Sequence, residues 1–185
     1  MRITQKPYPV TFAHKEVIED SSDHLSTYIY SFTSLDNNQR YIIRAEHHAG
    51  DVFGIKFYAK NHELSKSKYQ IITNYQYPVR VFITCASIIP ILSEAYPNAS
   101  FGFIGARSIK KGMIIESLEM NIRFKIYTEH IPQLISDKLF EHYEYPTISS
   151  YLIVNKNHDL DRKKLEIEEM FFKNYRDVHA PFAID

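Results

Sequence analysis

The strongest constraint on the fold is a run of alternating apolar and polar residues between positions 27 and 75, interrupted by short polar turns. In residues 27–34, Tyr28, Tyr30 and Phe32 fall on one side of an extended chain and Ile29 on the other. The same pattern predicts further strands over residues 40–47, 52–60 and 68–74. Because connections this short join antiparallel neighbours, we expect a four-strand meander.

After residue 78 the apolar positions recur every three or four residues, which predicts a helix over residues 78–96. Pro78 suits its first turn, and Pro90 is expected to kink or split it because proline has no backbone N–H. The remaining predicted elements are a buried strand over 100–105, a loop tip at 110–112, a helix over 121–135, strands over 138–145 and 149–155, and an amphipathic helix over 159–175.

Together these elements predict a single α+β domain, an antiparallel sheet with its helices packed on one face. We expect residues 1–25 to be a lead-in, 26–156 the α+β domain and 157–185 a C-terminal helix packed on it. Residues 14–20 fit either a short helix or a strand. Cys85, the single cysteine, lies on the apolar stripe of the first helix, so we expect a core side chain.

Composition excludes several classes of function. Lys+Arg and Asp+Glu number 22 each, and a neutral chain does not predict strong non-specific binding to nucleic acid. No apolar run approaches the roughly 20 residues of a membrane helix, and no secretory signal is recognisable, so we expect a cytoplasmic protein without membrane contact. Only five glycines and no phosphate-binding loop are present, and no cofactor is predicted.

Catalytic and metal-binding patterns receive no support either. His47 and His48 are adjacent, so on a strand they point to opposite faces and cannot share a metal ion. The other histidines lack ligand spacing, and acidic pairs such as Glu116 and Glu119 are ordinary charged surface. We therefore predict no catalytic residue and no metal ligand, and the sequence favours a protein that is not an enzyme.

A local excess of positive charge is the feature that suggests a ligand. Between positions 101 and 126 five bases face two acids; the bases are Arg107, Lys110, Lys111, Arg123 and Lys125. Arg123 and Tyr127 are four residues apart and share a helix face, and Asn74 ends a predicted strand before a helix start. The candidate ligand- or anion-binding residues are therefore Asn74, Arg107, Arg123, Lys125 and Tyr127. The alternative, which we favour, is a solvated loop and a structural helix anchor.

Several short motifs lie in the same region: Ile72-Thr-Asn-Tyr75, Val81-Phe-Ile-Thr-Cys85, Tyr96-Pro-Asn-Ala99, Phe103-Ile-Gly105 and Arg123-Phe-Lys-Ile-Tyr127. With these motifs the chain resembles a family of small uncharacterised bacterial proteins of the Bacteroidetes type, over roughly residues 27–127. That family has Arg-x-Arg-Leu-Tyr in the last motif, so Lys125 and Ile126 depart from it, and residues 108–119 are additional here. The resemblance implies the order strands, helix, strand, helix, and it implies no activity.

Three functions stay open at this point. The 14 tyrosines favour an interface, so the preferred hypothesis is a non-catalytic interaction or regulatory module with a protein partner or a second copy of itself. The second is a single-stranded nucleic-acid-binding protein that uses the basic residues. The third is a small-molecule or anion binder, or an enzyme, with a pocket near Asn74, Arg123 and Tyr127.

Overall fold

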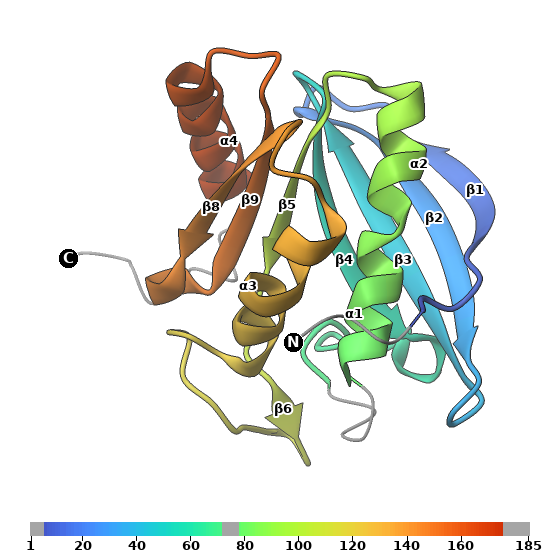
Figure 1. The fold of residues 1–185 in the computed structure, drawn as a ribbon. Coiled ribbons are helices and arrows are strands. Elements are labelled where there is room, and N and C mark those ends of the chain that lie inside the picture. The colour runs from blue at the N-terminus through green and yellow to red at the C-terminus, as the bar shows by residue number, and fades with distance from the viewer. Residues whose placement is uncertain (1–5, 72–77, 176–185) are drawn as a thin grey trace.

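A computed structural model describes residues 6–71 and 78–175. In these residues helices pack against one large sheet (Figure 1). The sheet strands are β1 (Thr11–Val17), β2 (His24–Ser34), β3 (Gln39–His48), β4 (Val52–Ala59), β5 (Ser100–Ile104), β8 (Phe140–Tyr145) and β9 (Ser150–Asn155). A separate hairpin consists of β6 (Ile109–Lys110) and β7 (Met113–Ile114). The helices are α1 (Pro78–Ala86), α2 (Ile88–Ala95), α3 (Ile122–Leu134) and α4 (Leu160–Asn174), with short 3-10 turns at Lys60–His62 and Pro146–Ile148.

The sheet is mostly antiparallel, with strand order β1-β2-β3-β4-β5-β9-β8 and a single parallel pair, β4 with β5. The predicted strand over 68–74 is not found: its described part, 68–71, forms turns, and Ile71 makes one isolated bridge to Ile109. The reason is that β5 occupies the edge of β4 where that strand would have paired. The meander instead includes β1, which comes from the segment that fitted either a helix or a strand.

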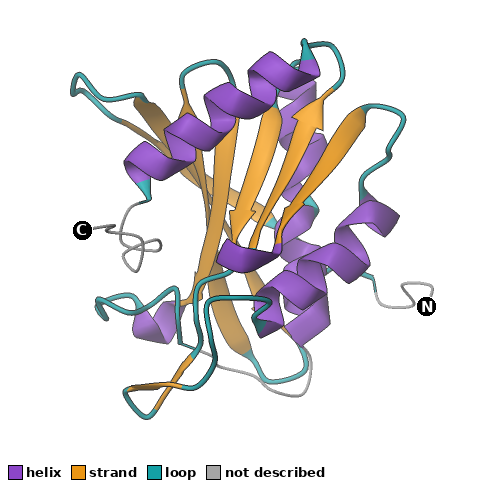
Figure 2. Cartoon of the chain, turned by 90° about the vertical axis from the view of Figure 1, so that its left-hand side faces the viewer, coloured by secondary structure: helices purple, strands orange, loops and turns teal. Residues whose placement is uncertain are grey.

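The helices cover both faces of the sheet, so the expectation that they pack on one face is wrong. Tyr151 and Ile153 of β9 belong to the core under α1, α2 and α3. Leu152 and Val154, which alternate with them, pack against Phe171 of α4 on the opposite face. A strand that is apolar on both sides needs cover on both sides. Figure 2 views the molecule from the side of α4, which crosses in front of the strands.

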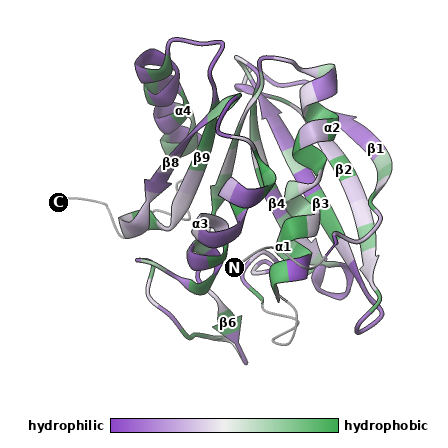
Figure 3. Cartoon of the chain, viewed as in Figure 1, coloured by the Kyte–Doolittle hydropathy of each residue, from purple (hydrophilic) through white to green (hydrophobic). Residues whose placement is uncertain are grey.

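The predicted helix over 78–96 is split at Ser87 into α1 and α2. Pro90 is the third residue of α2, so its missing N–H falls in a first turn, where no intrahelical partner is needed. The Ser87 hydroxyl donates to the Thr84 carbonyl (2.7 Å) and satisfies part of the broken ladder. The residues of both short helices are mostly hydrophobic, whereas those of α4 are mostly hydrophilic (Figure 3). Cys85 is fully buried in this core, as predicted.

The parallel pair positions the site. Its pairing runs from Val52 with Ser100 to Ile55 with Phe103, after which β4 continues to Ala59 while β5 ends at Ile104. The strands therefore separate at their carboxyl ends, and α3 begins beside that opening. Asn121 caps α3 by accepting from Phe124 N (2.9 Å), and its amide donates to the carbonyl of Gly105 just after β5. The cap thus fixes α3 to the end of the strand.

Candidate anion-binding cavity

A cavity of about 90 Å³ lies where β4 and β5 separate, between α3 and the C-terminal end of α4. Its walls are mainly apolar and aromatic. They are formed by Gly54, Ile55, Lys56, Phe57, Tyr69, Gly102, Ile104, Ala106, Arg123, Tyr127, Phe171 and Tyr175. Only Lys56 and Arg123 among these residues carry a full charge, and both are positive. The carboxyl end of parallel strands is a recurrent position for ligands because the strands separate there.

Arg123 is the most unusual residue of the cavity. Its side chain is only 7% exposed, yet it forms no hydrogen bond and no ion pair with any residue that the structure describes. Its guanidinium lies 5.5 Å from the centre of the Phe57 ring, which gives it one favourable cation–π contact. Burial lowers the pKa of Arg123 from its ordinary value because a charged group loses its hydration there. A guanidinium has five donors, and none of them bonds to a described residue. Its nitrogens are not fully enclosed, so they are open to the cavity, and Glu116 adds an attraction at longer range.

Tyr127 lies one helical turn after Arg123 and contributes a phenol to the same cavity. It is 3% exposed and packs its ring against Phe103 and Phe82, at centroid distances of 5.1 Å and 5.2 Å. Burial raises the pKa of Tyr127 well above its usual range, so the hydroxyl stays protonated and is able to donate. None of the described residues forms a hydrogen bond with that hydroxyl.

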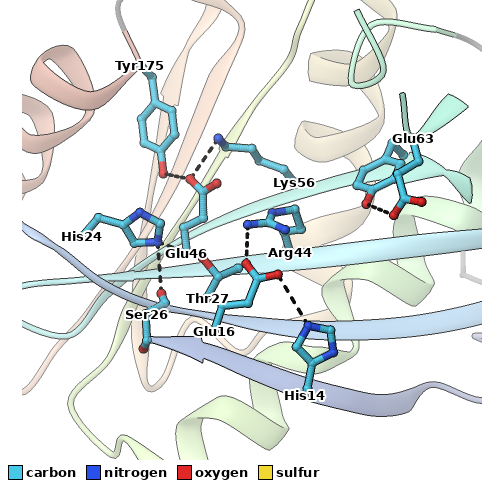
Figure 4. Close-up of polar contacts among 11 residues, drawn as sticks. His14, Glu16, His24, Ser26, Thr27, Arg44, Glu46, Lys56, Glu63 and Tyr175 are labelled. Atoms are coloured by element: carbon cyan, nitrogen blue, oxygen red, sulfur yellow. Dashed lines mark hydrogen bonds and ion pairs between the residues drawn. The ribbon is translucent and has the colours of Figure 1, made fainter. Parts of the chain in front are cut away.

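Lys56, by contrast, is fully compensated by a polar network on the α4 side of the sheet (Figure 4). Its ammonium lies 2.9 Å from Glu46 Oε2, and the Tyr175 hydroxyl donates to the same oxygen at 2.7 Å. Burial alone would raise the pKa of Glu46, but Lys56 and Tyr175 hold that pKa below its ordinary value. Since Glu46 neutralises Lys56, Arg123 is the one cation of the cavity that has no ion-pair partner among the described residues.

His48 completes the buried end of this network. Its Nε2 lies 2.9 Å from the Tyr175 hydroxyl, and since the single hydroxyl proton goes to Glu46, Nε2 must be the donor. His48 Nδ1 has no hydrogen-bond partner in the described structure, as fits a neutral ring. Burial lowers the pKa of His48 to about 4. His24 stacks on His48 with ring centres 5.0 Å apart.

An ion pair extends the polar surface toward the β1 edge of the sheet (Figure 4). Arg44 donates to Glu16 Oε2 at 2.9 Å, and His14 lies 3.5 Å from the other oxygen of that carboxylate. Burial alone would lower the pKa of Arg44, but Glu16 holds it above its ordinary value. Arg44 therefore already has its anion, which sets it apart from Arg123.

The structure brings together two of the five residues that the sequence nominated. Arg123 and Tyr127 line the cavity, whereas Lys125 is exposed on another face of α3. Arg107 is half-buried in the loop after β5 and does not line the cavity, and Asn74 lies outside the described residues. Since Arg123 is buried and the lysines of the β6–β7 hairpin are exposed, these bases do not form one patch.

Sequence reasoning missed Lys56, Tyr69 and the aromatic residues of α4 because they reach the cavity only through long-range packing. One local signal pointed to it. Gly54 and Gly102 are isolated glycines inside strands, which often mark a close approach of another group. A Cβ at Gly54 would meet the Tyr175 hydroxyl, and one at Gly102 would meet the Phe171 ring. The two glycines admit the side chains that close this side of the cavity.

No protein-family model, no curated protein and no solved structure matches the chain. The resemblance to a Bacteroidetes-type family therefore stays a prediction. Within residues 6–71 and 78–175, no helix is long and apolar enough to cross a membrane. In the same residues no three histidine, cysteine or acidic side chains gather as a metal site would require.

Proposed function

We propose that the protein binds a small organic anion, with its carboxylate or phosphate group held by Arg123 in the cavity between β4 and β5. The observation that carries this proposal is the buried side chain of Arg123, which forms no ion pair and no hydrogen bond with any described residue and is attracted by Glu116 only from beyond ion-pair distance. The lining of this cavity supports the third of the functions that the sequence left open, a small-molecule or anion binder.

The physical argument is one of charge burial. A buried cation without a partner is costly by several kcal/mol, and a bound carboxylate or phosphate would offset that cost through two parallel hydrogen bonds. Tyr127 adds a protonated hydroxyl beside the guanidinium. The cavity of about 90 Å³ is smaller than the roughly 150 Å³ that holds a benzene molecule, so it accepts an acid group and a few further atoms.

Binding is tested by calorimetric and NMR titration with acetate and with inorganic phosphate. Acetamide, which has the shape of acetate without its charge, is the control. We expect saturable binding of at least one anion and none of acetamide. Arg123→Met keeps much of the side-chain volume and removes the charge, and it should weaken binding about 30-fold or more. Lys125→Met is the matched control, because it removes an exposed charge from the same helix and should leave affinity unchanged.

The stability of the unliganded protein separates a ligand-binding arginine from a structural one. If Arg123 serves a ligand, Arg123→Met removes a buried charge that has no ion-pair partner among the described residues, and the free energy of unfolding should stay equal or rise. A loss of about 3 kcal/mol or more in urea unfolding, together with unchanged anion affinity, would assign Arg123 to the fold and overturn the proposal. Arg123→Lys keeps the charge without the fork geometry, and about tenfold weaker binding is expected.

A second candidate is the interaction module that the sequence favoured, self-associating through a sheet edge. The specific observation is β1, an edge strand with Phe12 52% and Val17 66% exposed. Exposed apolar edge strands pair readily with other chains. Sedimentation across a concentration series tests this function: a dimer that Val17→Lys converts to a monomer supports it, and a monomer at all concentrations rejects it.

A further inference from the structure

An open groove of about 700 Å³ lies beside the cavity, between α4 and the strands β5, β8 and β9. Its floor is apolar, and its main lining residues are Ile104, Ile148, Leu152, Phe171 and Phe172. Phe172 is 60% exposed to solvent although it is a large aromatic side chain. A contiguous apolar surface of this kind in a hollow is typical of a ligand-binding groove.

The groove and the cavity are neighbours because they share wall residues. Ile104 and Phe171 line both spaces, so the two are adjacent. Phe171 packs over Gly102, where the strand offers no side chain of its own. A ligand held in the cavity therefore has an apolar surface directly beside it on the α4 side.

The charges of the two spaces are opposite, and this gives the ligand an orientation. The cavity carries Arg123, whereas the groove is bordered by Glu168 and Glu169 of α4. Glu168 accepts a hydrogen bond from Tyr145 and lies 3.7 Å from the Lys164 ammonium. Glu169 is therefore the acid at this border that has no ion-pair partner among the described residues. An acid group is attracted to the cavity and repelled from the groove, and an uncharged apolar chain suits the groove.

We infer that the ligand is an amphiphilic anion: an acid group bound at Arg123, and an unbranched or aryl apolar tail that lies along the groove between α4 and β9. The inference rests on the proposed function, since it assigns the tail of the same ligand. Carboxylic acids and alkyl phosphates share this chemistry, and direct comparison of the two head groups distinguishes them.

The test is a chain-length series on the full-length protein: acetate, hexanoate and dodecanoate, with dodecyl phosphate as the other head group and dodecanol as the uncharged control, all below their micelle concentrations. Each methylene that enters the groove should tighten binding by about two- to fourfold, the upper figure corresponding to full burial. Dodecanoate or dodecyl phosphate should therefore bind at least about 100-fold more tightly than acetate, and dodecanol should bind far more weakly.

Two variants on α4 locate the tail. Phe172→Ala removes part of the groove wall and should weaken dodecanoate binding about fivefold or more while acetate binding stays the same. Leu165→Ala is the matched control, because Leu165 is also an exposed apolar residue of α4 (56% exposed) and does not line the groove. It should change neither affinity.

The outcomes separate this inference from the proposed function. Arg123-dependent binding of acetate with no gain along the series would leave the anion site in place and overturn the tail assignment. Tight dodecanoate binding that neither Arg123→Met nor Phe172→Ala weakens would show detergent-like association and overturn it as well. If the wild-type protein binds none of these anions, both the anion site and the tail assignment are rejected.

Discussion

Arg123 and Lys56 line one cavity and carry the same charge, but their surroundings assign them different roles. Glu46 lies within 2.9 Å of the Lys56 ammonium, so that cation belongs to the fold. Arg123 has only the face of Phe57 as a favourable neighbour among the described residues that contact it directly. An evolved core seldom leaves a guanidinium in this condition, because the same volume filled by an apolar side chain would be more stable. The cost is most simply explained by function.

At the residue scale, the buried His48 should make the free energy of unfolding depend on pH. Burial lowers the pKa of His48 to about 4, whereas the unfolded chain titrates near 6.5. Between these values the unfolded state binds a proton that the native state does not, so stability is complete above pH 6.5 and falls as the pH drops toward 4. The expected loss between pH 7 and pH 4.5 is about 2 to 3 kcal/mol, measured by urea unfolding.

His48→Gln cannot titrate and provides the comparison. The free energy of unfolding of this variant should be lower than that of the wild type at pH 7. Between pH 7 and pH 4.5 this free energy should decrease less than in the wild type, by most of the roughly 2 to 3 kcal/mol expected from His48. An unchanged pH dependence would show that another group is responsible. Glu46 contributes in the same direction only at lower pH, because its pKa is already below the ordinary value.

The hydroxyl of Tyr175 predicts a stability effect of its own. It donates to Glu46 and accepts from His48 in a buried position, so Tyr175→Phe leaves both groups with one partner fewer. We expect a loss of about 1 to 3 kcal/mol in urea unfolding. Tyr143→Phe is the control: Tyr143 belongs to the same side of the sheet, and its hydroxyl bonds to no described residue. A change near zero is expected there.

At the scale of elements, two helix caps that make the same side-chain hydrogen bond differ in burial. Asn121 accepts from Phe124 N at 2.9 Å and is 2% exposed, while Asp159 accepts from Arg162 N at 2.9 Å on the surface. Asp159→Ala should cost about 1 kcal/mol, the usual loss for an N-cap. Asn121→Ala should cost about 2 kcal/mol or more, because it also removes the bond to Gly105. Equal losses in thermal or urea unfolding would contradict the anchoring role of Asn121.

The contact between β5 and α4 is tested at Gly102. A Cβ there would overlap the Phe171 ring, so Gly102→Ala should destabilise the protein by about 1 to 3 kcal/mol through overpacking. Phe171→Leu removes the ring and costs a similar amount alone. In the double variant the clash is absent, and the combined loss should be smaller than the sum of the two. Additive losses would show that the two residues do not press on each other.

Much of the element order could be predicted from local pattern. The strands β2, β3 and β4 and the helices α3 and α4 follow periodicities that the sequence displays directly. The position of α4 could not be predicted, because an amphipathic helix fits either face and β9 is apolar on both. The same limit applies to the cavity. Arg123 and Tyr127 are neighbours on one helix, but Tyr175 and Lys56 are 119 positions apart and meet only through tertiary packing.

At the scale of the whole molecule, we expect the cores on opposite faces of the sheet to unfold as one cooperative unit, since the same strands separate them. The chain contains no tryptophan, so the fluorescence of a single introduced tryptophan reports the unfolding of its own surroundings. Phe12→Trp on β1 and Phe172→Trp on α4 replace side chains that are 52% and 60% exposed. Their urea transitions should coincide. Separate midpoints would show that α4 and the meander unfold independently.

The short parallel seam also has a kinetic consequence. Local hairpins connect each of the strands β1 to β4 with the next one. By contrast, β5 reaches β4 only after the chain has passed through α1 and α2, and four residue pairs make up the register of β4 with β5. We expect such a non-local closure to form late, after the meander, because the ends of a long loop have to be brought together first. Because the cavity lies at the end of this seam, an anion bound there recognises only molecules in which the closure is complete. A bound anion should therefore slow the opening of the sheet while leaving the rate of its assembly almost unchanged.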